Sequence, residues 1–134
     1  MRGAGVDRSR ERLSIAARAL SSLRELAVLP EPTAIERDAA IQRFAYSFEA
    51  TWKAARRFLH AFEGVEAGSP KACVRAAREA GLLTDADAAA ALGMADDRNL
   101  TAHTYNESLA ELIFSRLPRH LVLMERWQSE MARG

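Results

Sequence analysis

Hydrophobic residues recur along most of the chain at steps of three and four, the spacing of one face of an α-helix. The clearest stretch runs from Thr33 to Phe62, where the apolar side chains step by 3, 4, 4, 3, 4 and 3 residues. These side chains are Ile41, Phe44, Phe48, Trp52, Ala55, Leu59 and Phe62. A near-heptad seam of this length predicts a long helix that packs antiparallel to another in a bundle.

A second stripe predicts a first helix from Val6 to Leu29, which the two prolines of "LPEPT" terminate. Its apolar side chains are Leu13, Ala16, Leu20, Leu23 and Leu26. After the second helix, Ser69 is a good N-cap and Pro70 a favourable first residue for a third helix that extends to Ala80. Gly81 fits the end of that helix.

Two further caps predict the rest of the fold. Thr84 caps a fourth helix that continues into "DDRNL", and Asn106 caps a last helix from Glu107 to Met131. Pro118 should kink this last helix or divide it. The apolar residues expected to face inward are Leu109, Leu112, Ile113, Leu117, Leu121 and Met124. No useful strand pattern is present, so we predict an all-α, antiparallel bundle of four to five helices, in a single domain that spans residues 1–134.

The aromatic residues of the second helix occupy more than one of its faces. They are Phe44, Tyr46, Phe48, Trp52, Phe58 and Phe62. A stripe this wide favours a homodimer with symmetric contacts. A buried core within one chain is the competing interpretation.

Composition narrows the function classes. The chain has 134 residues and a formal net charge of +1, which argues against tight non-specific binding to nucleic acid. It shows no apolar run long enough to span a membrane and no pattern of a secretory signal. The lone Cys73 permits neither an internal disulfide nor a zinc site by itself, and we expect it to be buried. These features predict a cytoplasmic protein with no membrane partner, metal or cofactor, and His60 and His120 are expected at the surface.

The segment "DDRNLTAHTYNE" is unusually polar for a packed helix. On a continuous helix, Asp96, Asn99 and His103 share one stripe, and Arg98 and Tyr105 fall on the next. Arg98 and His103 are then about 140° apart, from 100° per residue. They can converge on a ligand only if the helix ends or bends near His103, or if a second subunit completes the site.

Two interpretations of this segment stay open at this point. A histidine can exchange protons near neutral pH and an arginine can hold a phosphate, so Arg98 and His103 suit metal-independent cleavage of RNA with a 2′-hydroxyl nucleophile. Alternatively, the segment is a solvated helix end in which Arg98 pairs with an acid. On the second helix, Glu49 and Lys53 form an i,i+4 ion pair that Trp52 could place beside a groove.

The stretch "RNLTAHTY" resembles the motif of the HEPN superfamily: an arginine, a polar residue, three more residues and a histidine, here with a tyrosine two residues later. Three blocks, "RDAAIQRFAYSFEATWKAARRFL", "SPKACVRAAREAGLL" and "DDRNLTAHTYNESLAELIFSRLP", resemble the small bacterial nucleotidyltransferase substrate-binding proteins. The resemblance covers about Arg37 to Leu117. It implies a dimeric helical bundle that binds a separately encoded minimal nucleotidyltransferase.

The resemblance also implies roles for individual residues. Arg98 and His103 would be the catalytic pair of a metal-independent ribonuclease toxin, and Tyr105 would accept AMP from the nucleotidyltransferase acting as antitoxin. The supporting residues would be Asp96, Asn99, Glu49 and Lys53. The related block often reads Phe-Glu where this chain has Phe44-Ala45, which leaves Glu49 as the remaining acid. The alternative is a non-catalytic substrate-binding subunit of the nucleotidyltransferase, with RNA or a nucleotide as possible ligand.

Overall fold

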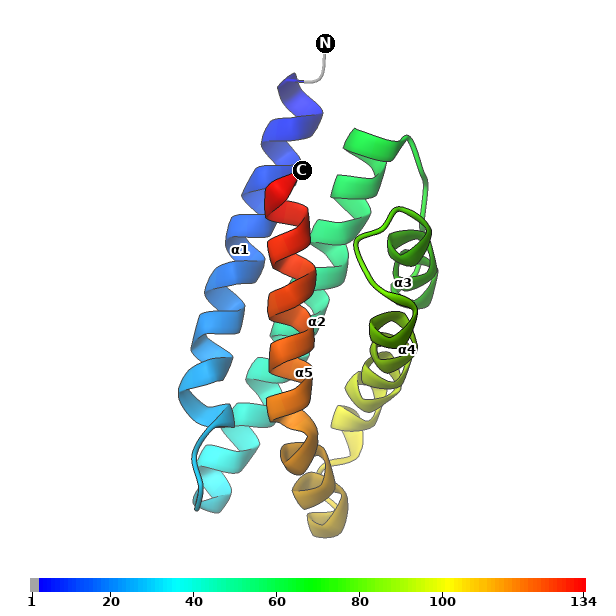
Figure 1. Ribbon diagram of the computed structural model, residues 1–134. Helices are drawn as coiled ribbons and strands as arrows, with labels where there is room; N and C mark the ends of the chain where they lie inside the picture. The colour runs from blue at the N-terminus through cyan, green and yellow to red at the C-terminus, as the bar shows by residue number, and fades with distance from the viewer. Residues whose placement is uncertain (1–2) are drawn as a thin grey trace.

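In the computed structural model, which describes residues 3–134, three long helices run side by side and two shorter helices cover one side of them (Figure 1). The long helices are α1 (Gly3–Ala27), α2 (Ala34–Glu63) and α5 (Glu107–Arg133). The shorter helices are α3 (Pro70–Glu79) and α4 (Asp85–Leu100), and the 3₁₀ turn η1 (Thr101–His103) follows α4. Helices α1 and α4 run in one direction, and α2 and α5 run in the other (Figure 1). The predicted all-α bundle is therefore confirmed.

The helix ends form where the sequence predicts caps. The side chains of Ser69, Thr84 and Asn106 accept hydrogen bonds from the backbone N–H groups of Ala72, Asp87 and Leu109, respectively. Each bond satisfies a donor in the first turn of a helix that has no partner within the helix. Gly81, two residues after the end of α3, has a φ of 79°, a left-handed conformation that favours glycine. Local chemistry thus sets the element boundaries to within a few residues of the prediction.

The core is built from the predicted stripes. Phe44 and Phe48 of α2 and Trp127 of α5 are almost fully buried, and Leu20 and Leu23 bring α1 against them. Most aromatic rings of α2 thus lie in the core of one chain, as the alternative to a dimer interface proposes. Tyr46, by contrast, is 59% exposed. The homodimer stays a prediction.

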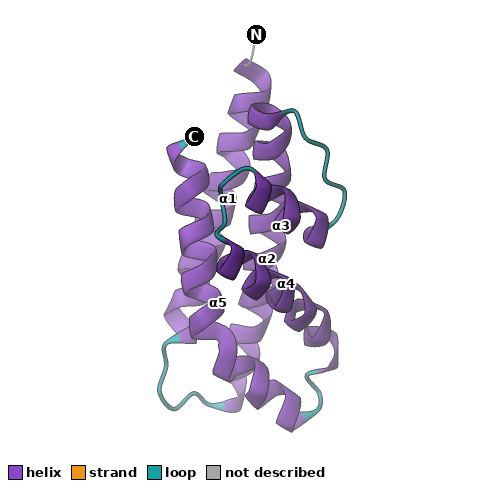
Figure 2. Cartoon of the chain, turned by 45° about the vertical axis from the view of Figure 1, so that its right-hand side comes forward, coloured by secondary structure: helices purple, strands orange, loops and turns teal. Residues whose placement is uncertain are grey.

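Two details of α5 differ from the sequence prediction. Leu112 was expected to face inward but is 45% exposed. The inner stripe instead passes through Ile113 and Leu117, and Leu112 lies about 100° away from Ile113 around the helix. Pro118 does not divide the helix, which continues to Arg133, but the first turns of α5 are inclined to the rest (Figure 2). The expected kink is present and the expected break is not.

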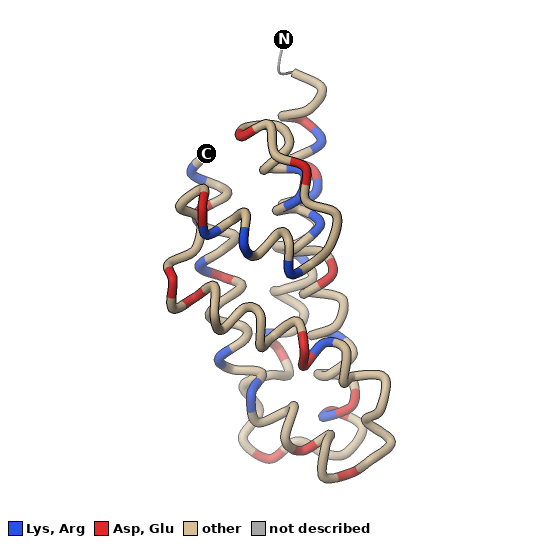
Figure 3. The backbone as a smooth tube through the Cα atoms, turned by 90° about the vertical axis from the view of Figure 1, so that its right-hand side faces the viewer, with Lys and Arg blue, Asp and Glu red and all other residues tan. Residues whose placement is uncertain are grey.

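Charged residues of both signs are interspersed along the described helices (Figure 3). None of these helices is long and apolar enough to cross a membrane.

Candidate functional site

The last turns of α4 hold three consecutive charged residues that contact three different helices. Successive residues on a helix point about 100° apart, so the three side chains diverge toward separate neighbours. Asp96 accepts a hydrogen bond of 2.7 Å from Lys71 of α3. Asp97 binds Arg116 and His120 of α5, both at 2.8 Å. Arg98 lies 3.3 Å from Glu49 of α2. This arrangement fixes the end of α4, and with it the polar segment.

Arg98 is braced from two sides. Its Nε lies 3.3 Å from the carboxylate of Glu49, and its Nη1 donates to the hydroxyl of Thr101 at 3.3 Å. Glu49 also accepts a hydrogen bond from the indole of Trp52 at 3.1 Å, and the ammonium of Lys53 lies 3.9 Å from it. The side chains of Arg98 and Glu49 are about one-third exposed, at 31% and 34%. The guanidinium is therefore oriented by the fold while part of it faces solvent.

His103 lies beyond the end of the α-helix. The α-helical part of α4 stops at Leu100, and the chain tightens into η1, which contains His103. The His103 imidazole is exposed and meets the edge of the Tyr105 ring, with 6.1 Å between the ring centroids. Tyr105 is 86% exposed. The helix therefore ends before His103, one of the conditions under which Arg98 and His103 can act on one ligand.

The predicted stripe of Asp96, Asn99 and His103 does not form, because it requires an α-helix up to residue 103. The Asp96 carboxylate turns to α3 and pairs with Lys71. Asn99 is exposed. The structure thus brings together Arg98, Glu49 and Lys53 but leaves Asp96 outside that group.

A groove of about 390 Å³ lies beside Arg98, between α2 and η1. Its lining comprises Asp38, Ile41, Gln42, Ala45, Arg98, Thr101, Ala102 and Thr104. Ala45 is the position where the related block often carries a glutamate, and here it contributes only a methyl group. Glu49 is the acid that pairs with Arg98.

An ion pair that the sequence analysis missed holds the segment that follows. The buried Arg37 at the start of α2 donates to Glu107 at 2.6 Å and to Asp38 at 3.1 and 3.2 Å. The hydrogen bond from Arg37 lowers the pKa of Glu107 below its usual range. Because Glu107 begins α5, this contact fixes the far end of the segment that carries His103 and Tyr105.

His120 was predicted at the surface, and this is wrong: it is only 8% exposed. Its Nε2 lies 2.8 Å from Asp97, and its ring stacks on Phe44 with 5.1 Å between centroids. Burial lowers the pKa of His120, although the hydrogen bond to Asp97 opposes this shift. The signal in the sequence was its position three residues after the buried Leu117, on the inner stripe of α5. His60, on the other hand, is exposed as predicted, and Cys73 is buried as predicted.

Within residues 3–134, no three or more His, Cys, Asp and Glu side chains are grouped as a metal-ligand set would be. The chemistry available at the end of α4 is that of a braced guanidinium, an exposed imidazole and an exposed phenol.

An all-helical bundle that carries Arg98, His103 and Tyr105 at the end of α4 is consistent with the resemblance to HEPN proteins. The sequence comparison specifies this further. The family model described as "Nucleotidyltransferase substrate binding protein like" matches residues 11–133, so the chain belongs to that family.

Two solved structures share the fold of this chain. A protein from Thermus thermophilus is 56% identical, with a TM-score of 0.85, over 87% of this chain and 98% of that one. A Haemophilus influenzae protein, whose structure is described as revealing the fold of a substrate-binding domain of a nucleotidyltransferase, is 21% identical. Its TM-score is 0.76, over 90% of this chain and 98% of the other, and it shows the shared fold. Among curated proteins there is no significant match.

Proposed function

We propose that this protein is a substrate-binding subunit that works with a separately encoded minimal nucleotidyltransferase. The observation that carries the proposal is the partly exposed guanidinium of Arg98 beside the exposed side chains of His103 and Tyr105, in a chain of this family. Arg98 would bind a phosphate group of the nucleotide, and its contacts with Glu49 and Thr101 reduce the side-chain entropy lost on binding. Tyr105 would lie at the contact with the partner enzyme.

A homodimer fits this site. Four large hydrophobic side chains are exposed on α2 and around the motif: Ile35 at 81%, Tyr46 at 59%, Leu100 at 37% and Tyr105 at 86%. Burying them against a second copy would be favourable. Such a contact would bring the two copies of Arg98 and His103 near each other, as the resemblance to the HEPN superfamily implies.

A second candidate function is a metal-independent ribonuclease toxin. The observation that favours it is the exposed imidazole of His103 in the same segment as a positioned guanidinium. His103 would take the proton of an RNA 2′-hydroxyl as that oxygen attacks the adjacent phosphorus, and Arg98 would stabilise the charge on the phosphate. The bond from phosphorus to the 5′-oxygen of the next nucleotide would break, which leaves a 2′,3′-cyclic phosphate, and the 5′-oxygen would take a proton from solvent. Neutralisation would then be the transfer of AMP from ATP to the phenol oxygen of Tyr105, with pyrophosphate as the leaving group.

One set of experiments separates the two functions. The protein is purified alone and together with the nucleotidyltransferase, and RNA cleavage is measured in EDTA. A substrate-binding subunit should co-purify at micromolar concentration and leave RNA intact. Cleavage that disappears in His103→Ala would instead establish the ribonuclease, and failure to associate would exclude the subunit function.

Intact mass then tests the modification. An increase by one or more AMP units after incubation with the nucleotidyltransferase and ATP should vanish in Tyr105→Phe. The matched control is Tyr46→Phe, because Tyr46 is the other tyrosine of the chain and is also exposed. Loss of the added mass in both variants or in neither would contradict Tyr105 as the acceptor.

A further inference from the structure

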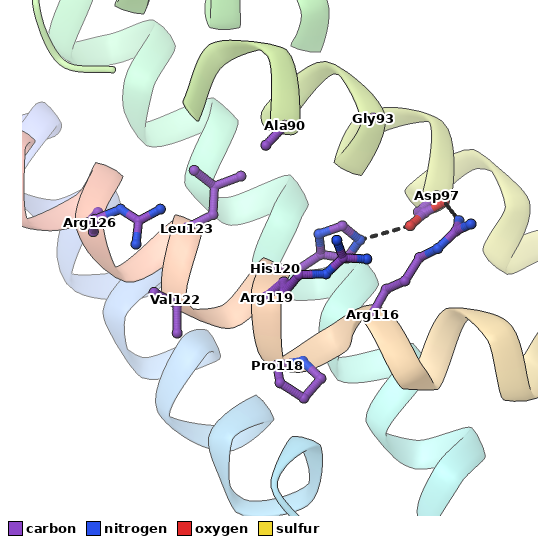
Figure 4. Close-up of a pocket in the computed structure, with 10 residues that line it drawn as sticks. All are labelled: Ala90, Gly93, Asp97, Arg116, Pro118, Arg119, His120, Val122, Leu123 and Arg126. Atoms are coloured by element: carbon purple, nitrogen blue, oxygen red, sulfur yellow. Dashed lines mark hydrogen bonds and ion pairs between the residues drawn. The ribbon is translucent and has the colours of Figure 1, made fainter. Parts of the chain in front are cut away.

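A pocket of about 710 Å³ lies between α4 and α5, on the side of α4 where Asp97 points and not on the side where Arg98 meets α2 (Figure 4). One part of its lining is uncharged: Ala90, Gly93, Pro118, Val122 and Leu123. The other part is ionisable: Asp97, Arg116, Arg119, His120 and Arg126. The volume falls within the range of small-molecule sites and exceeds what an inorganic ion would fill.

The charges around the pocket leave a positive excess. Arg116 pairs with Asp97 through Nη1 alone, and Arg126 is held by Asp87 through two hydrogen bonds of 2.8 and 3.1 Å. Arg119 makes no ion pair or side-chain hydrogen bond with any residue between 3 and 134. Arg116 and Arg119 are three positions apart on α5, and Figure 4 draws both beside His120, at the same end of the pocket. That end is suited to an anion.

Gly93 supplies an independent observation. Glycine inside a helix costs stability relative to alanine. The position has no close contact that would require glycine, because a Cβ built there meets nothing within 4 Å. Gly93 instead lines the pocket, where the missing side chain leaves a wall of backbone open to a ligand.

The geometry points to a second ligand site in this pocket, one that binds an organic phosphate monoester. The phosphate would lie between Arg116 and Arg119, and the apolar or planar body would lie along Gly93 and Leu123. The site uses none of Arg98, His103 or Tyr105 and goes beyond the proposed function. It places a ligand against a different side of α4 from the groove that contains Arg98.

The test is a calorimetric titration with AMP as the probe, with inorganic phosphate and adenosine titrated separately as its two parts. AMP should bind more tightly than either part. Arg119→Gln should weaken AMP binding at least about tenfold, because it removes a charge-assisted hydrogen bond. Its matched control is Arg75→Gln on α3, another exposed arginine without an ion pair within residues 3–134, which should leave binding unchanged.

A steric variant gives a second, charge-independent test. Gly93→Leu places a side chain in the pocket and should abolish AMP binding, while circular dichroism shows the helical fold retained. The proposal is overturned if the unaltered protein does not bind AMP at millimolar concentration, or if Arg119→Gln and Gly93→Leu both bind it normally. It is also overturned if only Arg98→Gln loses binding. A changed oligomeric mass in Gly93→Leu, without any effect on AMP binding, would assign this face to a protein contact instead.

Discussion

The carboxylate of Asp97 makes a buried polar contact between α4 and α5, and its replacement by asparagine tests this contact. The side chain is only 7% exposed and binds both His120 and Arg116 at 2.8 Å. Asp97→Asn keeps the size of the side chain but removes its charge. The amide oxygen can still accept the bond from Arg116, but the amide nitrogen then faces Nε2 of His120, which must change tautomer to accept from it, and both contacts lose the negative charge. We expect a loss of about 1.5–3 kcal/mol in the free energy of unfolding, the usual value of a hydrogen bond to a charged group.

The expected change in melting temperature follows from the size of the chain. At about 2.1 cal/mol/K per residue, 134 residues give an unfolding entropy of about 0.28 kcal/mol/K. The loss then corresponds to a decrease of roughly 5–11 °C in Tm. Scanning calorimetry at pH 7.5 measures Tm and the enthalpy together, and urea unfolding gives the free energy independently.

The neighbouring residue provides a matched control. Asp96→Asn is the same substitution one position earlier, but the Asp96 side chain is 61% exposed and pairs with a lysine that is itself 42% exposed. Exposed ion pairs contribute about 0–1 kcal/mol, so Tm should change by no more than roughly 4 °C. Equal losses in the two variants, or a negligible loss in Asp97→Asn, would refute the assignment of Asp97 as the stabilising partner of α5.

Three further results are expected. Gly93→Ala should raise the free energy of unfolding by about 0.5–1 kcal/mol, seen as a higher urea midpoint, and a lower midpoint would show that the helix needs glycine there. Burial lowers the pKa of His120 in the folded protein below its unfolded value of about 6.5. The neutral imidazole therefore contributes fully to the free energy of unfolding above about pH 6.5, and this contribution is lost as the pH falls from about 6.5 toward the folded pKa. His120→Gln should therefore flatten the decline of Tm as the pH falls below about 6.5, and a decline as steep as that of the unaltered protein would contradict the burial of His120. Burial also raises the pKa of the Cys73 thiol to about 11. Iodoacetamide at pH 7.5 should therefore modify this thiol only in denaturant. Rapid labelling of the native protein would contradict the burial of Cys73.

The features that the sequence predicts well are those determined by nearby residues. The caps at Ser69, Thr84 and Asn106 each bond a backbone N–H three residues later, so the local sequence is sufficient to locate them. The apolar stripes of α1 and α2 are similarly local, because helix period alone decides which residues share a face. Fold class and element order follow from these two signals together.

The features that the sequence does not predict depend on residues far apart along the chain. Glu49 meets Arg98, and His120 meets Asp97, only after the helices have packed. The histidine was expected at the surface because it has no ligand-spaced partner nearby, yet its place on the inner stripe of α5 puts it beside Phe44. A polar residue on an apolar stripe is ambiguous until its partner is known, and the partner lies on another helix.

Asp97 and Arg98 are adjacent in the sequence, so the pocket between α4 and α5 and the groove beside α2 share one turn of α4. Because they are about 100° apart on one turn, one side chain fixes α4 to α5 while the other reaches the groove beside α2. A helix turn held by buried contacts moves as a unit, so a change in the spacing of α4 and α5 must also change the position of the Arg98 backbone. The polar segment therefore depends for its geometry on a carboxylate outside the motif. A comparison restricted to the arginine, histidine and tyrosine would miss the residue that holds them in place.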